Sequence, residues 1–246
     1  MRVTFLGTGS AMPTGERFQT GLLLEGEAPL LLDCGSGVLH ALAGTDTGYE
    51  APGTVLLSHH HLDHVSDLLV LVKARWLAGE EQLTVLGPPG TAALLDGLLE
   101  VHEYMQGKVE LTVRELELGE SFSVAGMDVE SMETRHSMQA LAYRFEHGDS
   151  AFTFSADSEA FDALAAFADG SDALAHDCSF PDGVDVANHP TPSQLGEVLA
   201  GHDYGTVYLT HLYPHTRGRH EEMVGSVNEA YEGEVQVARD GLVLEL

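Results

Sequence analysis

Lysine is nearly absent from this chain of 246 residues. Only Lys73 and Lys108 occur, and 11 basic residues stand against 39 acidic ones, which gives a formal net charge of -28 at pH 7. A nucleic-acid-binding surface normally carries a basic patch that displaces counterions, and no Lys/Arg-rich run exists here. Self-repulsion of this size weakens a compact fold in dilute buffer, whereas molar salt shortens the screening length to about 3 Å. We therefore expect a halophilic protein from a haloarchaeal host; an ordinary acidic protein is the alternative.

Cysteines and long apolar runs are also scarce. Cys34 and Cys178 are the only cysteines, and two buried thiols in a reducing compartment are favoured over a disulfide. No apolar run reaches the roughly 20 residues of a membrane span, and the stretch 1–6 is too short for the apolar region of a signal peptide. We expect a cytoplasmic protein without a membrane partner. With 43% hydrophobic residues, the length fits a single domain over 1–246.

The chain concentrates histidine in one stretch, Ser58-His59-His60-His61-Leu62-Asp63-His64, which reads H-x-H-x-D-H. The stretch follows a short apolar run and precedes a longer one, so it is expected at a strand-to-helix connection, where catalytic groups commonly lie. Alternation along an extended segment puts His59 and His61 on the same side, where both imidazoles can bind one metal ion. Asp63 and His64 fall at the turn into the helix and can serve a second ion. A solvated histidine-rich loop is the alternative.

Further ligand candidates follow three strand-like segments elsewhere in the chain. They are His136, Asp157 and His211. The order H-x-H-x-D-H and then His, Asp and His resembles the metallo-β-lactamase-fold hydrolases over nearly the whole chain. This resemblance implies an α/β fold with four layers, an αβ/βα sandwich of two mixed sheets flanked by helices, with the metals at one edge.

The same resemblance implies a dinuclear metal centre. His59, His61 and His136 would bind one zinc ion, Asp63, His64 and His211 the other, and Asp157 would bridge the two. Two Zn²⁺ ions per chain are expected, and Mn²⁺, Fe²⁺ or Co²⁺ could use the same ligands. Two such ions would hold a hydroxide between them as the nucleophile of a hydrolysis. Asp63 could also orient that hydroxide, and Asp33 could orient a ligand histidine.

A hydrolysis of this kind also needs a proton for the leaving alkoxide. His189 is the candidate donor and Asp177 its orienting carboxylate; their surroundings resemble the Glu and His of the tRNA 3′-processing branch, with Asp in place of Glu. Arg217 and Arg219 form a local basic cluster after His211. They could grip a phosphate as bidentate donors, or be salt-bridged to neighbouring glutamates.

The motifs favour a phosphodiester substrate, by resemblance to the nuclease and phosphodiesterase branches. The tRNA 3′-endonucleases of this superfamily insert an arm after the third metal histidine, whereas residues 137–155 here predict a bare hairpin. We therefore predict a dinuclear-zinc phosphodiesterase acting on a small or flexible substrate, an RNA or a nucleotide. A ribonuclease Z-like tRNA 3′-processing endonuclease is the alternative. A lactone or thioester hydrolase and a non-catalytic metal-binding regulatory protein are further alternatives, and the family's habit suggests a homodimer.

The coarse pattern of the remaining chain alternates strands with helices. Three period-two segments, 109–113, 121–124 and 127–132, predict one continuous ribbon. The last helix is predicted over 223–231.

Overall fold

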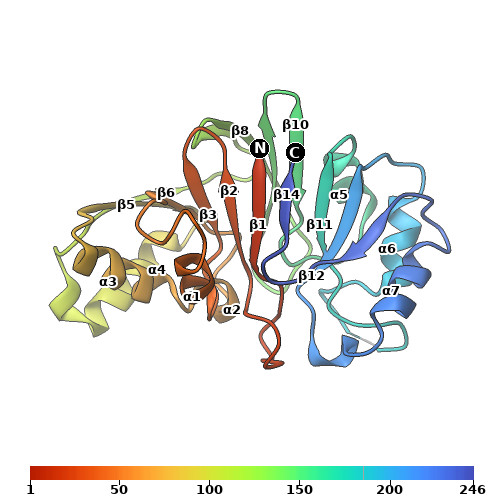
Figure 1. Cartoon of the computed structure of the whole chain (residues 1–246), viewed down its shortest axis with the longest axis horizontal. Helices are drawn as coiled ribbons and strands as arrows, with labels where there is room; N and C mark the ends of the chain where they lie inside the picture. Colours follow the sequence, from red (N-terminus) through yellow and green to blue (C-terminus); the bar gives the residue numbers. More distant parts are fainter. Residues whose placement is uncertain (185) are drawn as a thin grey trace.

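Two mixed sheets form the centre of the protein, shown in Figure 1 as a computed structural model that describes residues 1–184 and 186–246. The first sheet has the order β14-β1-β2-β3-β4-β5-β6. Its strands are β1 (Arg2–Gly7), β2 (Gly21–Glu25), β3 (Pro29–Leu32), β4 (Thr54–Leu56), β5 (Gln82–Gly87), β6 (Glu110–Glu115) and β14 (Val243–Glu245). Strands β3 to β6 pair in parallel, and the others pair antiparallel.

The second sheet has the order β13-β12-β11-β10-β9-β8-β7. Its strands are β7 (Ser121–Val124), β8 (Met127–Glu133), β9 (Leu141–His147), β10 (Ser150–Phe154), β11 (Ala173–Asp177), β12 (Thr206–Thr210) and β13 (Val235–Val237). Strands β10 to β13 are parallel, and β7 to β10 form an antiparallel meander.

Helices cover the outer face of each sheet. The first sheet carries α1 (Val38–Ala43), α2 (Leu62–Val65), α3 (Leu68–Ala78), α4 (Thr91–Val101) and the 3-10 turn η1 (Glu103–Met105). The second carries α5 (Asp162–Ala168), α6 (Pro192–Leu199), the 3-10 turn η2 (Pro214–Thr216) and α7 (His220–Val227). The two groups of helices lie at opposite ends of the long axis in Figure 1.

The sandwich explains why central strands such as β2 and β3 are almost continuously apolar. Leu22 and Leu24 of β2 belong to the core between the sheets, whereas Leu23 belongs to the core beneath the first helix layer. Successive side chains of a strand point to opposite faces, so a strand buried on both faces needs a continuous apolar run. Phe5 of the first sheet lies 5.8 Å from Tyr208 of the second, measured between ring centroids. The predicted αβ/βα sandwich is confirmed.

The C-terminal ends of several strands lie at one edge of the molecule. Strands β3 and β4 are parallel, and so are β10, β11 and β12. Strand β8 runs in the direction of β10, because both pair antiparallel with β9. The segments that follow these six strands therefore meet at one edge, and every predicted ligand lies in one of them.

Two local predictions were wrong. The segments around 110 and 121 do not form one ribbon: β6 is the edge strand of the first sheet, whereas β7 and β8 belong to the second. A period-two pattern predicts that a segment is a strand but not which strand it pairs with. The chain crosses from the first sheet to the second at 116–120. The last helix starts at His220, three residues earlier than predicted, and ends at Val227.

Both cysteines are buried and free, as predicted. Across the described residues, no helix has the length and apolarity that a membrane crossing requires.

Candidate metal centre

Three imidazoles and a carboxylate converge at the end of β4. The nitrogen of His61 that faces the group is Nδ1, which lies 3.1 Å from Nε2 of His59 and 3.1 Å from Nε2 of His136. A carboxylate oxygen of Asp157 lies 3.7 Å from both of those Nε2 atoms. The four residues could hold one metal ion.

A second group lies on the other side of Asp157. Nε2 of His211 is 3.1 Å from a carboxylate oxygen of Asp63 and 3.3 Å from one of Asp157. Nε2 of His64 is 3.2 Å from the other oxygen of Asp157. These four residues could hold a second ion, and Asp157 is shared by both groups. The structure thus brings together all seven residues that the sequence predicts as ligands.

The spacing of the donor atoms fits divalent metal ions. Donors around a tetrahedral zinc with bonds of about 2.0–2.1 Å lie about 3.3–3.4 Å apart, close to the 3.1 Å between the ring nitrogens. Nε2 of His64 is buried and, although it lies 3.2 Å from Asp157, it makes no well-aligned hydrogen bond among the described residues. A buried polar atom without a partner is costly, and coordination would satisfy it.

Hydrogen bonds behind the first group fix which ring nitrogen faces inward. The backbone N–H and hydroxyl of Ser58 each donate to the carboxylate of Asp33 over 2.7 Å. Because that hydroxyl is a donor, its oxygen accepts from Nδ1–H of His59 at 3.0 Å. Nδ1–H of His64 donates to Asp33 at 2.7 Å. Both histidines therefore turn Nε2 inward, which is the atom that a metal ion would bind.

Ser179 plays the same part behind His211. Its hydroxyl donates to Asp177 at 2.6 Å and accepts from Nδ1–H of His211 at 2.9 Å. Nδ1–H of His136 points to the backbone carbonyl of Asn188 at 3.3 Å. The serines are ligand-orienting residues that the sequence analysis missed. Their only signal was their position, next to a ligand in Ser58-His59 and two residues after an acid in Asp177-Cys178-Ser179.

The predicted proton donor lies beside the second group. Nδ1–H of His189 donates to Asp177 over 2.7 Å, and its ring stacks on His211 with centroids 5.5 Å apart. Burial by itself lowers the pKa of His189, but the neighbouring carboxylate of Asp177 outweighs it and raises the pKa to about 9. His189 is therefore protonated at neutral pH in the metal-free protein.

The buried ligands have strongly shifted pKa values. Burial and the nearby His64 lower the pKa of His59 well below its usual value. Burial also disfavours the charged form of His64, yet Asp157 and Asp33 together raise its pKa well above the usual value. Burial works against the ionised form of Asp157 too, but His211 and His64 hold its pKa well below the usual value. The centre thus contains an ionised carboxylate beside a protonated imidazole, and a metal ion would replace that proton.

Three residues of the centre have a left-handed backbone. Asp33, Ala156 and His211 have φ values of 57°, 53° and 58°. Asp33 and His211 directly follow β3 and β12, and Ala156 lies two residues after the end of β10. Such φ values are unfavourable for residues other than glycine and persist where the surroundings impose them, often at functional sites. The turn at Ala156 ends β10 and precedes Asp157, so it sets the direction of the shared carboxylate.

The two predicted phosphate-binding arginines are both paired with carboxylates. Arg217 contacts Glu16 and Arg219 contacts Glu222. Arg217 also lines a cavity of 270 Å³ together with Arg17 and Tyr213. The ring of Tyr213 lies 5.8 Å from that of His211, measured between centroids, and stacks on Phe180 at 4.4 Å. Tyr213 is a further residue at the centre that the sequence analysis did not single out.

The sandwich and the two His/Asp groups at its edge define the class: this chain has the metallo-β-lactamase fold. A family model described as anti-Pycsar protein Apyc1 matches residues 1–228, and the chain belongs to that family.

Known proteins of this fold are similar over most of the chain. The probable metallo-hydrolase YhfI of Bacillus subtilis is 28% identical over 253 residues, which cover 100% of both chains. Its crystal structure superposes with a TM-score of 0.85 at 27% identity, over 99% of each chain. A ribonuclease Z of Mycobacterium bovis is 28% identical over 194 residues, 72% of this chain and 69% of the relative. Human tRNase Z, short form, shares the fold with a TM-score of 0.79 at 20% identity, over 100% of this chain and 99% of that one.

Proposed function

We propose that the protein is a dinuclear metal-dependent hydrolase that cleaves a small or flexible phosphodiester. The observation that supports this most directly is the pair of His/Asp groups sharing Asp157, with a protonated His189 beside them. Two ions bound there would activate a water molecule and neutralise the charge of the phosphate. Zinc is the expected metal, and Mn²⁺, Fe²⁺ or Co²⁺ are alternatives with the same ligands.

The chain's own residues would supply the remaining steps. Asp63 lies within the second group and can accept a hydrogen bond from the attacking water as well as bind metal. As the new oxygen–phosphorus bond forms, the bond to the leaving oxygen breaks, and His189 would give that oxygen its proton. Asp177 holds His189 in place through Nδ1 and leaves Nε2–H as the donor. The products are a phosphomonoester and an alcohol.

Arg217 is proposed to contact the phosphate-bearing part of the substrate. It lies with Arg17 in the cavity beside Tyr213, and Glu16 would have to release it. Arg219 is held by Glu222 on α7, and its guanidinium also lies 3.5 Å from the carbonyl of Asp182. Arg219 would support the side of this cavity on which Arg217 lies, without lining it.

A ribonuclease Z-like tRNA 3′-endonuclease is the second candidate. The relative from Mycobacterium bovis favours it by name. The segment after His136 argues for smaller substrates, because the strands β9 and β10 that follow it are joined only by Gly148 and Asp149 and pair along their length. This short hairpin supports the proposal of a substrate that needs no gripping arm at this position.

The first experiment is metal content by plasma mass spectrometry on protein purified in molar salt, with hydrolysis of bis-p-nitrophenyl phosphate, nucleotide diesters and a 3′-extended tRNA precursor. About two metals per chain with small-diester turnover supports the proposal. Cleavage of the precursor alone would establish the second candidate, and metal without any turnover would direct attention to lactones, thioesters or a regulatory role.

We further propose a cytoplasmic homodimer from a salt-rich host. The outer face of α3 exposes Val70 and Leu77, at 53% and 70%. Lys73 and Lys108, the only lysines of the chain, lie over the ring of Trp76 on the same face. In so acidic a chain, a second copy would meet the least repulsion here. Sedimentation of a Leu77→Glu variant tests this, since a monomer is expected.

A further inference from the structure

The cavity of 270 Å³ beside the second metal group carries two arginines, and we call it the arginine cavity. Glu16 and Arg17 line it from the loop between β1 and β2, and Tyr213 and Arg217 line it from the segment after β12. No ligand candidate lines the arginine cavity, but the ring of Tyr213 lies 5.8 Å from that of His211, measured between centroids. A group bound in this cavity is therefore separate from a phosphate at the metals, and one small molecule can reach both.

Arg17 is held in place by neutral oxygens. Its Nη1 donates to the backbone carbonyl of Ala238 at 2.6 Å and to the hydroxyl of Thr8. The Thr8 hydroxyl donates in turn to one carboxylate oxygen of Asp240 at 2.6 Å. The other oxygen of Asp240 accepts from the backbone N–H of Phe18, also at 2.6 Å. Asp240 thus fixes the loop on one side of Arg17 and the residue that anchors its guanidinium, so the cation is positioned before any ligand binds.

The opposite edge of the Arg17 guanidinium is open. Nε and Nη2 make no hydrogen bond to a described residue and are not enclosed by protein, so both are accessible from the cavity that Arg17 lines. Burial lowers the pKa of Arg17, and the nearby Asp240 and Glu16 oppose this effect without forming an ion pair with it. Nε–H and Nη2–H are the parallel donors with which arginine binds two oxygens of a phosphate. This half-buried cation therefore has an unused bidentate edge.

Arg217 can add a second contact on the outer side of the cavity. Its side chain is exposed and is paired with Glu16, which lines the same cavity. An anion that enters would compete with Glu16 for Arg217, whereas it would find Arg17 without a competing carboxylate partner. A phosphoryl group has enough charge and oxygens to use both arginines.

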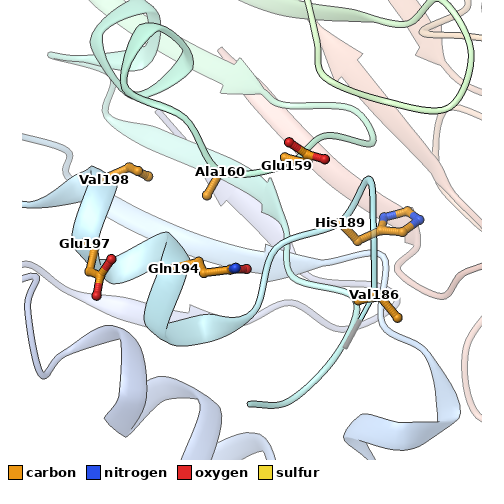
Figure 2. Close-up of a pocket in the computed structure, with 7 residues that line it drawn as sticks. All are labelled: Glu159, Ala160, Val186, His189, Gln194, Glu197 and Val198. Carbon is orange, nitrogen blue, oxygen red and sulfur yellow. The ribbon is translucent and has the colours of Figure 1, made fainter. Parts of the chain in front are cut away.

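The other cavity beside the centre, of 320 Å³, has the opposite charge. Figure 2 shows Glu159 after β10 and Glu197 on α6 in its lining, which includes no lysine or arginine among the described residues. The imidazole of His189 points away from the α6 residues in this view. Because carboxylates repel anions, a second anionic group on a substrate is favoured in the arginine cavity over this acidic cavity.

We propose that the arginine cavity is a second anion site of the enzyme, and that Arg17 makes it specific for phosphodiesters that carry an additional phosphoryl group. This rests on the proposed phosphodiesterase function. The reacting phosphate lies at the metals, and the additional group accepts hydrogen bonds from Nε and Nη2 of Arg17. Arg17 is a specificity-determining residue and takes no part in bond cleavage.

The test compares p-nitrophenyl phosphodiesters whose retained alcohol ends in a phosphonate, a hydroxyl or an amine, with linkers of two to four methylene groups. A second series carries the phosphonate on the leaving phenol, so that either orientation of the substrate is sampled. The metal-loaded protein is expected to give the highest kcat/KM on a phosphonate and the lowest on the amine. Molar KCl should reduce the preference for phosphonate over hydroxyl.

Two substitutions should move this preference in opposite directions. Arg17→Gln is expected to lower the ratio of kcat/KM between phosphonate and hydroxyl substrates about tenfold or more, the range of a hydrogen bond to a charged group. Glu16→Gln removes the carboxylate that holds Arg217 and should raise the ratio about twofold, the range of an exposed ion pair. Glu16 is exposed, so its replacement leaves the packing intact.

Two further variants control for charge and folding. Arg239→Gln removes an exposed arginine that follows β13 at the same edge but does not line the arginine cavity, and it should leave the ratio unchanged. Arg17→Lys keeps the charge without the bidentate edge and should keep only part of the preference. Thermal melts identify any variant that is destabilised; if Arg17→Gln is one, Arg17→Lys and Glu16→Gln carry the test.

The outcomes are distinct. A ratio that falls in Arg17→Gln, rises in Glu16→Gln and stays constant in Arg239→Gln supports the second anion site. Turnover without a phosphonate preference in either series, or with a preference that Arg239→Gln lowers as much as Arg17→Gln does, overturns this site and keeps the phosphodiesterase. No turnover of any diester by the metal-loaded wild type overturns both.

Discussion

Replacing His189 by alanine should reveal a general acid through its dependence on the leaving group. With a pKa of about 9, His189 is about 97% protonated at pH 7.5. Loss of a general acid typically costs about 10²–10⁴ in rate. This loss should appear in kcat on alkyl diesters, whose alkoxide needs a proton, and almost vanish on p-nitrophenyl esters, whose phenolate leaves unaided.

The carboxylate behind the acid gives a matching prediction. Without Asp177, the pKa of His189 should fall toward the ordinary 6.5, where only about 9% is protonated at pH 7.5. Asp177→Asn should therefore cost up to about tenfold on alkyl diesters at that pH. Because the acid must be protonated, activity is lost as pH rises through its pKa, so the falling limb of the pH profile should move to lower pH. Bound metal ions would lower the pKa in wild type, which makes tenfold an upper limit.

The assay is steady-state hydrolysis of a series of diesters that differ only in the acidity of the leaving alcohol, with metal content measured on each variant. His189→Ala should keep two metals, since the ligand set is unchanged, whereas Asp177→Asn needs the metal measurement because Asp177 also holds Ser179 behind His211. A plot of log kcat against leaving-group pKa should become steeper for His189→Ala. Equal losses on alkyl and p-nitrophenyl substrates would refute the acid role and make His189 a structural support of His211 and His136.

Three other changes have definite expected results. His61→Ala should lose one metal equivalent and nearly all turnover, because its Nδ1 lies between two other donors; metal analysis that still found two ions would contradict the assignment. Arg217→Ala should raise KM with little change in kcat if the guanidinium grips phosphate in ground and transition state alike, and an unchanged KM would leave it simply as the partner of Glu16. The melting temperature should rise with KCl concentration, since salt screens a net charge of -28; a salt-independent midpoint would remove the halophile hypothesis.

The seven ligand candidates could be predicted because each of them leaves a local trace and their order resembles that of a known family. The spacing of His59, His61, Asp63 and His64 is characteristic, and the remaining ligands follow short apolar runs. Strand ends that meet at one edge of a sandwich bring such residues together whatever the loop lengths between them. The motif and its resemblance to the metallo-β-lactamase-fold hydrolases therefore predicted both the layers and the ligand candidates.

The hydrogen-bonding residues behind the ligands were harder to predict. Asp33 was suggested from its place after an apolar strand, and the structure puts its carboxylate 2.7 Å from His64. Ser58 and Ser179 could not be distinguished from ordinary serines, because their role depends on which ring nitrogen of a distant histidine faces them. Tyr213 and the acidic cavity depend on loop packing, which hydrophobic periodicity does not describe. The same limit explains the wrong ribbon, since strand pairing is decided by tertiary contacts.

The two cavities beside the centre are lined by residues of opposite charge. One is lined by Arg17, Arg217 and Tyr213, the other by Glu159, Glu197 and His189. They meet at Tyr213 and His189, whose ring centroids are 5.9 Å apart. A phosphodiester bound at the centre would therefore have arginines on one side and glutamates on the other. An RNA that continued along the acidic side would bring further phosphates near those glutamates, and this repulsion would favour a short substrate.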